Sequence, residues 1–267
     1  MNPGPSKVSI RTLQKMKQQG ERIAMLTAYD YSLARILDDA GTDVLLVGDS
    51  LGMVVQGKSS TVPVTVEEMI YHGEMVARAA KRAMVVVDLP FPVGQLGVKH
   101  TLKIAARIMK KTGCEAVKLE GGAAQADVIA ALVSAGIPTI AHVGLRPQTV
   151  HALGGYRVHR NEDQLKHDAW AAESAGAFAL LMECVPAESA TKISKEIKIP
   201  TIGIGAGNGC DGQVLVTHDL LGMSQGNGAK FVRQYLDFKQ LCTQAVQSFR
   251  NDVRSGQFPG ENESYHS

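Results

Sequence analysis

The sequence predicts an α/β protein that folds as a closed barrel of eight parallel strands with helices around it. Short apolar runs recur along the chain, and each ends in a polar or glycine-rich cluster. Stretches with helical spacing lie between these runs. Glycine is abundant, with 27 residues in 267, and it often stands where a run gives way to a loop. Alternation of this kind is typical of a parallel sheet that helices cover.

The apolar runs are predicted as strands. They are continuous rather than alternating, which is typical of strands buried on both faces. An open doubly wound sheet would explain the alternation of runs and helices, but not so many units of regular length. We therefore expect a single (β/α)8 barrel domain over residues 1–267. The eight runs cover residues 23–27, 44–47, 84–87, 116–119, 139–141, 179–182, 201–204 and 213–216.

Helices are predicted between the strands. Residues 66–81 are amphipathic, and Thr65 is a plausible N-cap with Glu67 and Glu68 in the first turn. Four helical stretches end in a glycine that precedes the next strand, which is typical of a C-cap. The other helical stretches cover residues 31–40, 100–111, 124–135, 163–175 and 186–195.

Two helical segments lie outside the repeating units. Residues 6–19 are expected to close the bottom of the barrel or to pack on a neighbour. Residues 231–254 carry aromatic side chains at helical spacing. They could pack on the barrel, but the aromatic stripe favours contacts between subunits, because exposed aromatic side chains need burial. Residues 255–267 are rich in Gly, Ser and Glu, and we expect a loosely ordered tail.

Composition excludes several classes of protein. Lys and Arg (28) nearly balance Asp and Glu (26), which argues against a nucleic-acid or membrane-surface footprint. No apolar run approaches the ~20 residues of a membrane span. Residues 1–7 have no apolar core, so we expect no secretory signal. The four cysteines form no CxxC pair and are expected as buried, reduced thiols. We expect a soluble, cytoplasmic protein.

Acidic residues stand at the ends of four predicted strands: Asp49, Asp88, Glu120 and Glu183. The carboxyl ends of the strands form the active-site face of a (β/α)8 barrel, so these side chains are expected at one mouth. Four carboxylates would repel one another unless a cation lay between them. Carboxylate oxygens are ligands for Mg²⁺, which we therefore expect here. Any single acid could instead pair with an arginine or cap a helix.

Lys118 and His142 are further candidates for the same mouth. Lys118 lies two residues before Glu120, so both side chains leave one face of a strand. A lysine in a buried strand needs an anion, which we expect to be Glu120, Glu183 or a substrate carboxylate; a plain buried ion pair is the alternative. His142 is expected to line the site or to orient the substrate, since the carboxylates already satisfy a hard metal ion.

Together these residues predict metal-assisted enolisation of a small 2-oxo acid. A metal ion on strand-end carboxylates would draw charge from the carbonyl and acidify the neighbouring carbon. Lys118 would stabilise the enolate as its charge develops. Glu183 lies farthest from the other three acids, so we assign it as the base.

Several segments resemble one enzyme family over nearly the whole chain. The chain is similar to the 3-methyl-2-oxobutanoate hydroxymethyltransferases (ketopantoate hydroxymethyltransferases). The matching segments occur in the same order and at similar spacing as in the family, which makes the resemblance specific. They cover residues 27–30, 47–53, 61–65, 88–91, 117–122, 142–145, 154–156, 183–186 and 202–207.

The resemblance implies a (β/α)8 TIM barrel of the phosphoenolpyruvate mutase type with extra N- and C-terminal helices. It implies transfer of a hydroxymethyl group from 5,10-methylenetetrahydrofolate to 3-methyl-2-oxobutanoate, which gives 2-dehydropantoate for pantothenate biosynthesis. Family members are homo-oligomers, often decamers, and use one Mg²⁺ per subunit. The residues implied are Asp49, Asp88 and Glu120 for the metal, Asp49, Ser50, Asp88 and Lys118 for the oxo acid, and Glu183 as proton acceptor.

The chain departs from the family pattern at 58–59, at 92–94 and at Arg146. None of these positions is a proposed ligand. Two other functions remain open. A carbon–carbon lyase of the same superfamily would use a similar metal site, but would carry a catalytic cysteine on a loop after the third or fourth strand. A non-catalytic barrel that binds a metabolite would have no need for Lys118, Glu120 and Glu183 in one mouth.

Overall fold

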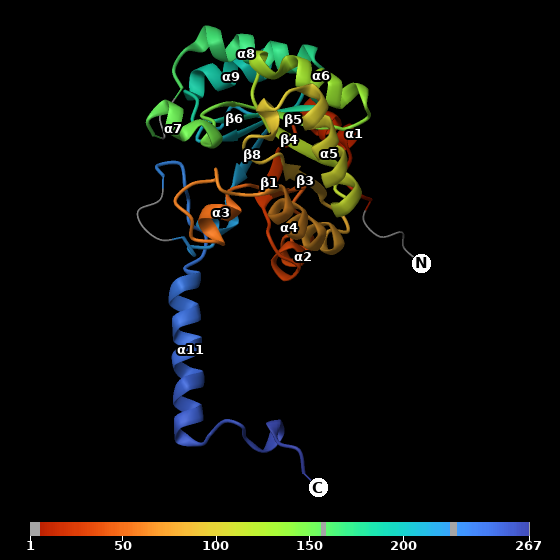
Figure 1. Ribbon diagram of the computed structural model, residues 1–267. Helices are drawn as coiled ribbons and strands as arrows, with labels where there is room; N and C mark the ends of the chain where they lie inside the picture. The colour runs from red at the N-terminus through yellow and green to blue at the C-terminus, as the bar shows by residue number, and fades with distance from the viewer. Residues whose placement is uncertain (1–5, 156–158, 225–228, 267) are drawn as a thin grey trace. The chain divides into compact units, whose positions relative to one another are not determined.

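A computed structural model describes residues 6–155, 159–224 and 229–266 (Figure 1). Residues 1–5, Tyr156 of the family-like segment 154–156, and Ser267 of the tail lie outside the described residues. The chain divides into two compact units, Met1–Val216 and Thr217–Ser267. The first unit contains all eight strands. The expectation of one domain over residues 1–267, and of a loosely ordered tail over 255–267, stays a prediction.

The eight strands form a closed barrel in chain order, and every neighbouring pair is parallel. The predicted fold class is therefore confirmed. The last strand pairs with the first, so the sheet has no free edge. The strands are β1 (Ile23–Thr27), β2 (Val44–Val47), β3 (Met84–Asp88), β4 (Ala116–Glu120), β5 (Thr139–Gly144), β6 (Ala179–Glu183), β7 (Thr201–Ile204) and β8 (Gly212–Leu215).

Helices separate most of the strands, within a few residues of their predicted bounds. The predicted N-cap of α4 (Val66–Ala79), Thr65, is confirmed, and it forms a capping box: Thr65 Oγ1 accepts from the Glu68 N–H at 3.1 Å, and the Thr65 N–H donates to the Glu68 carboxylate at 2.7 Å. Between β7 and β8 the chain runs through residues 205–211 without a helix. The helices between strands are α2 (Tyr31–Asp39), α4 (Val66–Ala79), α5 (Val98–Thr112), α6 (Ala126–Ser134), α8 (Glu162–Ser174) and α9 (Ala187–Glu196).

Short elements that the sequence analysis did not predict occupy the loops after the strands. The helices α3 and α7 lie on the same side of the barrel (Figure 1). The short elements are α3 (Leu51–Val54), η1 (Val93–Gln95), η2 (Ala123–Gln125), η3 (Pro147–Thr149) and α7 (Val150–Leu153).

Apolar side chains form two cores, one on each face of the sheet. One core packs the outward-facing strand residues against the helices. The other fills the barrel interior with residues from alternate strand positions, such as Met84, Val86, Ala116 and Ile140. This alternation fixes which strand residues point inward, and it continues to the end of each strand.

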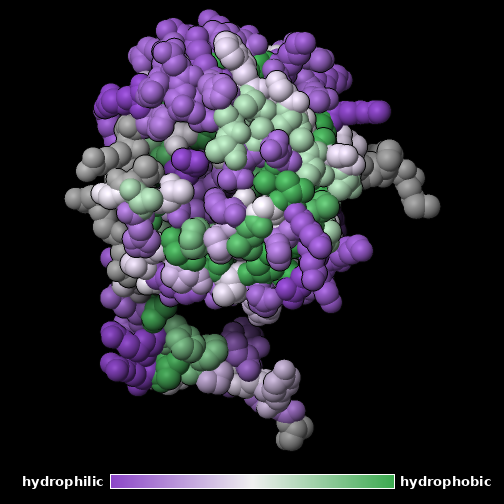
Figure 2. All heavy atoms as spheres, turned by 45° about the horizontal axis from the view of Figure 1, so that its top comes forward, coloured by the Kyte–Doolittle hydropathy of each residue, from purple (hydrophilic) through white to green (hydrophobic). Residues whose placement is uncertain are grey.

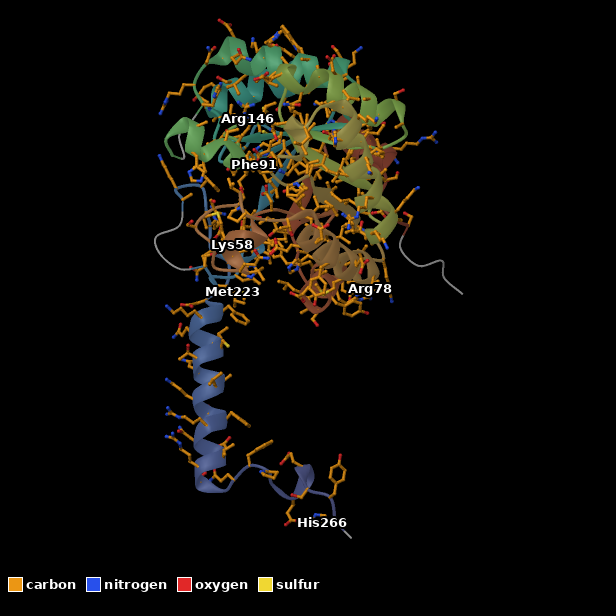
Figure 3. All side chains as sticks on the ribbon, in the orientation of Figure 1. Lys58, Arg78, Phe91, Arg146, Met223 and His266 are labelled. Carbon is orange, nitrogen blue, oxygen red and sulfur yellow. The ribbon has the colours of Figure 1, made fainter. Side chains whose placement is uncertain are left out.

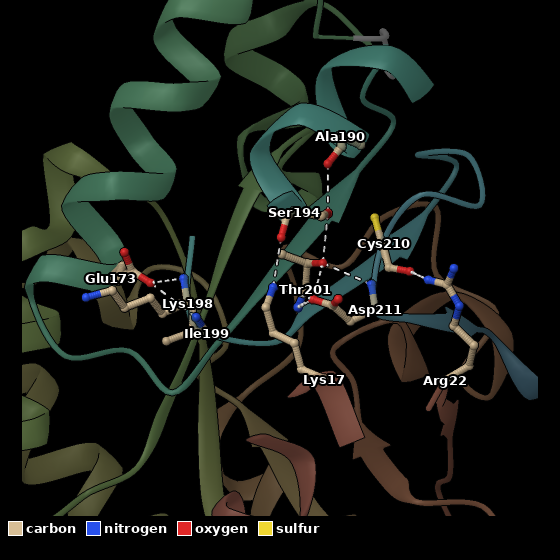
Figure 4. Close-up of polar contacts among 10 residues, drawn as sticks. All are labelled: Lys17, Arg22, Glu173, Ala190, Ser194, Lys198, Ile199, Thr201, Cys210 and Asp211. Carbon is tan, nitrogen blue, oxygen red and sulfur yellow. Dashed lines mark hydrogen bonds and ion pairs between the residues drawn. The ribbon is translucent and has the colours of Figure 1, made fainter. Parts of the chain in front are cut away.

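A polar network ties strands together at their amino ends (Figure 4). Asp211 accepts hydrogen bonds from Lys17 Nζ at 2.7 Å and from the Thr201 N–H and hydroxyl, both at 2.8 Å. Lys17 belongs to α1 (Ile10–Gln19), which begins later than the expected 6–19 because Ser9 is its N-cap. As expected, this helix therefore contacts the bottom of the barrel, at the end opposite the strand-end acids.

The second unit contains α10 (Thr217–Leu220), α11 (Phe238–Ser255) and η4 (Glu261–Glu263). The helix predicted over 231–254 is shorter and begins at Phe238, with Asp237 as its N-cap. Within this unit, hydrophobic side chains lie on one side of the helix and hydrophilic ones on the other (Figure 2). Exposed apolar residues of α11 include Leu241, Val246 and Phe249. Among the described residues, no helix is both long and apolar enough to cross a membrane.

Candidate active site

The strand pattern brings the predicted charged residues into the barrel interior. Met84 and Val86 point inward, and Asp88 follows at the same period of two. Ala116 is followed in the same way by Lys118 and Glu120. Asp88 and Glu120 end their strands within the sheet, and so does Glu183, rather than following the strands as expected. The carboxylates are therefore held by strand backbone at the barrel mouth.

Asp49 and Ser50 lie on the loop after β2, against the end of β3. The backbone N–H of Asp49 donates to Oδ2 of Asp88 at 3.0 Å. The hydroxyl of Ser50 shares a hydrogen bond with the hydroxyl of Tyr29 at 2.8 Å. A Cβ at Gly48 would lie 2.7 Å from Ser50 Oγ, so glycine allows this tight turn. The backbone of Asp49 is thus fixed against Asp88, and the side chain of Ser50 is fixed by Tyr29.

Lys118 forms an ion pair with Asp88, with Nζ 3.1 Å from Oδ1. Neither Glu120 nor Glu183 is therefore its ion-pair partner, as had been expected, and the pair is the plain buried ion pair of the alternative; a contact with the substrate stays a prediction. The reason is the sheet register, which pairs Asp88 directly with Lys118 across β3 and β4. Both side chains are almost fully buried, at 6% and 4% exposed. Lys118 is the only buried lysine or arginine in the described part of the chain.

Burial perturbs the carboxylates strongly. Burial and the nearby charge of Asp88 raise the pKa of Asp49 to about 7. Burial, with the charge of Asp49, raises the pKa of Glu120 well above its ordinary value. Burial raises the pKa of Glu183 to about 7, while Lys118 acts against this rise. Burial alone would lower the pKa of Lys118, but Asp88 and Glu120 outweigh burial and raise it. The mouth holds more negative charge than one lysine can neutralise.

His142 lies between Lys118 and Glu183. Its Nδ1 is 3.2 Å from Lys118 Nζ, and its Nε2 is 3.3 Å from Oε2 of Glu183. Burial and the charge of Lys118 lower the pKa of His142 well below its ordinary value. The ammonium group can only donate, so Nδ1 accepts and the ring proton is on Nε2, facing Glu183. His142 is therefore neutral, with its ring N–H on the side of Glu183, although Nε2 makes no hydrogen bond within the described residues.

Backbone contacts hold Glu183 at its place. Its carbonyl oxygen accepts from the Leu145 N–H at 2.8 Å. The next residue, Cys184, has a left-handed backbone with φ of 50°, and its N–H donates to the Ile204 carbonyl at 2.9 Å. A left-handed backbone is unfavourable for a residue with a Cβ, so neighbouring strands must enforce this turn. The Glu183 side chain is 18% exposed, more than the other charged groups of the mouth.

The donor set suits a hard divalent cation. As the side chains stand, no group of three or more His, Cys, Asp or Glu in the described ranges could hold a metal ion. Mg²⁺, however, is commonly held by only one or two carboxylates and keeps other positions for water and substrate. Oε1 of Glu120 is buried and accepts no hydrogen bond from the described residues. Among the described residues, the mouth has more buried carboxylates than buried cations, and one oxygen of Glu120 has no hydrogen-bond donor. Both features fit a bound Mg²⁺ ion.

Gln148 also lies at this mouth, but it was not predicted from the sequence. Its side chain is buried and donates to Asp49, and its backbone donates to Glu120. A polar residue in the loop after the fifth strand was the only sequence signal for it. Tyr29 was part of a family-like segment, but its contact with Ser50 was not expected.

The departures from the family pattern lie in loops around the mouth. Lys58 follows α3, Phe91 precedes the segment 92–94, and Arg146 follows β5. Figure 3 shows these three labelled residues toward the side of the barrel that carries α3 and α7. The nitrogen of Lys58 pairs with Glu68 at 3.2 Å. None of the three contributes a proposed metal or base residue.

Comparisons with known proteins agree on one family. A family model described as ketopantoate hydroxymethyltransferase matches residues 7–261. A 3-methyl-2-oxobutanoate hydroxymethyltransferase from Rhodopirellula baltica is 57% identical over 260 residues, covering 97% of each chain. A protein of the same name from Desulforapulum autotrophicum is 51% identical, covering 97% of this chain and 98% of that one.

Solved structures with low sequence identity share the fold. Phosphoenolpyruvate phosphomutase from Streptomyces platensis subsp. rosaceus matches with a TM-score of 0.63 at 15% identity, covering 93% of this chain and 88% of that one. A phosphonopyruvate hydrolase in complex with oxalate and Mg²⁺ matches with a TM-score of 0.61 at 13% identity, covering 95% and 92%. A 2,3-dimethylmalate lyase, a PEP mutase/isocitrate lyase superfamily member, matches at 0.60 and 15%, covering 98% and 90%. These likenesses support the barrel type alone.

Proposed function

Because the chain belongs to the ketopantoate hydroxymethyltransferase family, we propose that it transfers a hydroxymethyl group from 5,10-methylenetetrahydrofolate to 3-methyl-2-oxobutanoate. Water is consumed, and the products are 2-dehydropantoate and tetrahydrofolate. The proposed cofactor is one Mg²⁺ per subunit, held by Asp49 and Asp88 with Glu120 directly or through water. We expect this reaction in the cytoplasm.

One observation carries this proposal: the buried carboxylates of Asp49, Asp88 and Glu120 and the partly exposed carboxylate of Glu183 lie at a mouth that holds a single buried ammonium group among the described residues. When bound, Mg²⁺ would neutralise the excess charge and polarise the keto group of the substrate. Mg²⁺ and Lys118 would pair with the other three acids. Glu183, the most exposed of the four, would then have no cation beside it. That difference suits a group that must accept and return a proton.

The residues of the chain then have separate roles. Ser50 and Lys118, with Asp49 and Asp88, orient the oxo acid. Lys118 stabilises the negative charge that develops on the enolate oxygen. Glu183 accepts the proton from C3 of the substrate, and its pKa of about 7 suits this exchange near neutral pH. The enolate carbon then bonds to the one-carbon unit of the folate, and the new C–C bond replaces the former C3–H bond. Both C–N bonds of that unit break, and a water molecule supplies the oxygen of the new hydroxyl group. The C3 proton and the two protons of the water end on the two folate nitrogens and on that hydroxyl group.

Proton exchange tests the proposal without the folate. The protein is incubated with 3-methyl-2-oxobutanoate and Mg²⁺ in D₂O, and the C3 proton signal is followed by NMR. The proposal predicts Mg²⁺-dependent loss of that signal, because enolisation needs only the oxo acid, the metal ion and the base. Exchange no faster than in protein-free buffer would overturn the proposal.

The same measurement separates the other two functions. A carbon–carbon lyase of this superfamily or a metabolite-binding barrel predicts no exchange. The cysteines also count against a lyase with a cysteine acid. Cys114 is buried before β4, and burial raises its pKa to about 11. Cys184 adjoins Glu183, and burial raises its pKa to about 11 as well. Cys242 is exposed, which corrects the expectation that all the thiols are buried.

We further propose that the chain assembles into a homo-oligomer, a decamer in the family pattern. Support comes from the apolar face of α11, where Leu241, Val246 and Phe249 are each more than half exposed in the single chain. Apolar side chains at helical spacing gain stability when a second surface covers them. Native mass spectrometry measures the assembly directly. A monomer at micromolar concentration would contradict this proposal.

A further inference from the structure

Gln148 is the only side chain outside the predicted set that hydrogen-bonds a proposed metal-ligand side chain in the described residues. It lies in η3, directly after the strand that carries His142. Its amide nitrogen donates to Oδ2 of Asp49 at 2.8 Å and to the carbonyl of Leu89 at 3.0 Å. Both neighbours are acceptors, so the group that faces them must be the NH₂ and not the oxygen. The orientation of the amide is thereby fixed.

The backbone of the same residue reaches a second carboxylate. The Gln148 N–H donates to Oε2 of Glu120 at 3.1 Å. This leaves Oε1 of Glu120 as the oxygen without a hydrogen-bond donor. One residue therefore holds one oxygen of Asp49 and one oxygen of Glu120, which come from loops or strands far apart in the sequence.

The loop that carries Gln148 is itself well fixed. The N–H and the hydroxyl of Thr149 both contact the carbonyl of Arg146 at 2.9 Å, which closes a tight turn around Gln148. The Gln148 side chain is 5% exposed. A buried amide with both N–H groups engaged is a rigid support, since losing either bond would leave a buried polar group unpaired.

We propose that Gln148 is a positioning residue, which holds the carboxylates of Asp49 and Glu120 in the orientation that binds the divalent cation. The proposal rests on the proposed function, because it assumes that these carboxylates bind Mg²⁺. Residues that hydrogen-bond metal ligands orient them, and their removal typically weakens metal binding about 10–100-fold. Gln148 would act through the ligands and would not contact the metal ion.

Binding of Mg²⁺ to the full-length protein, measured by calorimetry without substrate, tests this role. Gln148→Met keeps the length and the apolar stem of the side chain but removes the amide donor. We expect its Mg²⁺ affinity to fall about tenfold or more. Gln56→Met is the matched control, because Gln56 also donates to a carboxylate, that of Glu68 at 2.8 Å, away from the proposed ligands. Its Mg²⁺ affinity should equal that of the wild type.

A second readout distinguishes positioning from general damage. If Gln148 only positions ligands, Gln148→Met should raise the Mg²⁺ concentration that half-saturates proton exchange, and saturating Mg²⁺ should restore most of the rate. If Gln148→Met does not fold, Gln148→Asn keeps an amide that is too short to reach both acceptors, and should show the same weakening.

Three results of these Mg²⁺-binding measurements would count against the role of Gln148. Affinity of a folded Gln148 variant within twofold of the wild type would overturn the positioning role. An equal loss in Gln56→Met would overturn it too, because the effect would not be specific to the mouth. Absence of Mg²⁺ binding by the wild type would overturn the proposed function itself, and the role of Gln148 with it.

Discussion

The ammonium group of Lys118 lies 3.1 Å from Oδ1 of Asp88, its register partner on the neighbouring strand. This pair joins a proposed metal ligand to the only buried cation among the described residues. The same contact gives Lys118 a structural role beside its proposed role in binding the substrate. It stabilises a carboxylate that the barrel interior would otherwise hold unpaired.

Lys118→Met is expected to destabilise the protein by about 3 kcal/mol, because removal of one partner leaves a buried charge uncompensated. Binding of 3-methyl-2-oxobutanoate should weaken at least tenfold, about 1.4 kcal/mol, because its carboxylate and enolate oxygens lose their cation. Urea unfolding and calorimetry measure the two effects. Lys17→Met is the control, since Lys17 pairs with Asp211 at the other end of the barrel. If Lys118→Met bound the oxo acid as well as Lys17→Met, the substrate role of Lys118 would be wrong.

Proton exchange by the enzyme is expected to rise with pH through about 7. Burial raises the pKa of Glu183 to that value, and only the deprotonated carboxylate can accept a proton from the substrate. The rate at low substrate concentration should therefore be low at pH 6 and level off above pH 8. NMR in buffered D₂O gives the profile.

Glu183→Gln should abolish this exchange at every pH while the oxo acid still binds, because the amide is similar in shape but cannot act as a base. Residual exchange at the wild-type rate would show that another group is the base. Glu188→Gln is a control at a neighbouring position in the first turn of α9. It should leave the pH profile unchanged.

Gly144→Ala is expected to misplace Glu183. Gly144 has φ of 90°, and a Cβ there would overlap the backbone oxygen of Glu183. Gly136 has a similar φ of 79°, but a Cβ there would meet open space. Both alanine variants should lose about 1–2 kcal/mol from the left-handed backbone. Only Gly144→Ala should lose more stability than this and also slow the exchange of the C3 proton of the substrate. Equal losses in stability and equal exchange rates would contradict this account of Glu183.

Acid should remove a stabilising contribution from Asp38. Burial alone would raise its pKa, but the backbone N–H groups of Ala83, Lys81 and Arg82 outweigh burial and lower it below 3.8. A depressed carboxyl pKa adds stability above the unfolded value, and this stability is lost as pH falls through the folded value. Asp38→Asn should therefore cost about 2 kcal/mol at pH 7. Urea unfolding of both proteins from pH 7 to pH 3 should show this difference shrinking below about pH 4. A difference that stays constant over that range would contradict the prediction.

Much of the fold follows from local sequence. Continuous apolar runs such as Val44–Val47 were predicted as buried strands, and the glycines after α2, α5, α6 and α8 marked where the next strand begins. The strand-end acids were also predictable, since a period of two carries Asp88 and Glu120 onto the inner face. The place of these two acids in the barrel was therefore predictable from the strands, whereas the choice of metal ligands among the four acids came from the family resemblance.

Other features depend on contacts between distant segments. The partner of Lys118 is set by the register of β3 against β4, which the sequence of neither strand reveals. Gln148 meets Asp49 only because two loops converge, and no periodicity marks such a position. The long C-terminal helix begins at Phe238 and not at 231, because Asp237 caps it.

Asp49 and Asp88 are proposed to hold one divalent cation at the barrel mouth. A crystal soaked with Mn²⁺ and 3-methyl-2-oxobutanoate tests this most directly, because Mn²⁺ replaces Mg²⁺ at oxygen sites and scatters anomalously. We expect one anomalous peak per chain, within coordination distance of carboxylate oxygens of Asp49 and Asp88, with the keto oxygen of the substrate as a further ligand. A well-ordered mouth with no peak, or a peak bound only by other residues, would contradict this proposal.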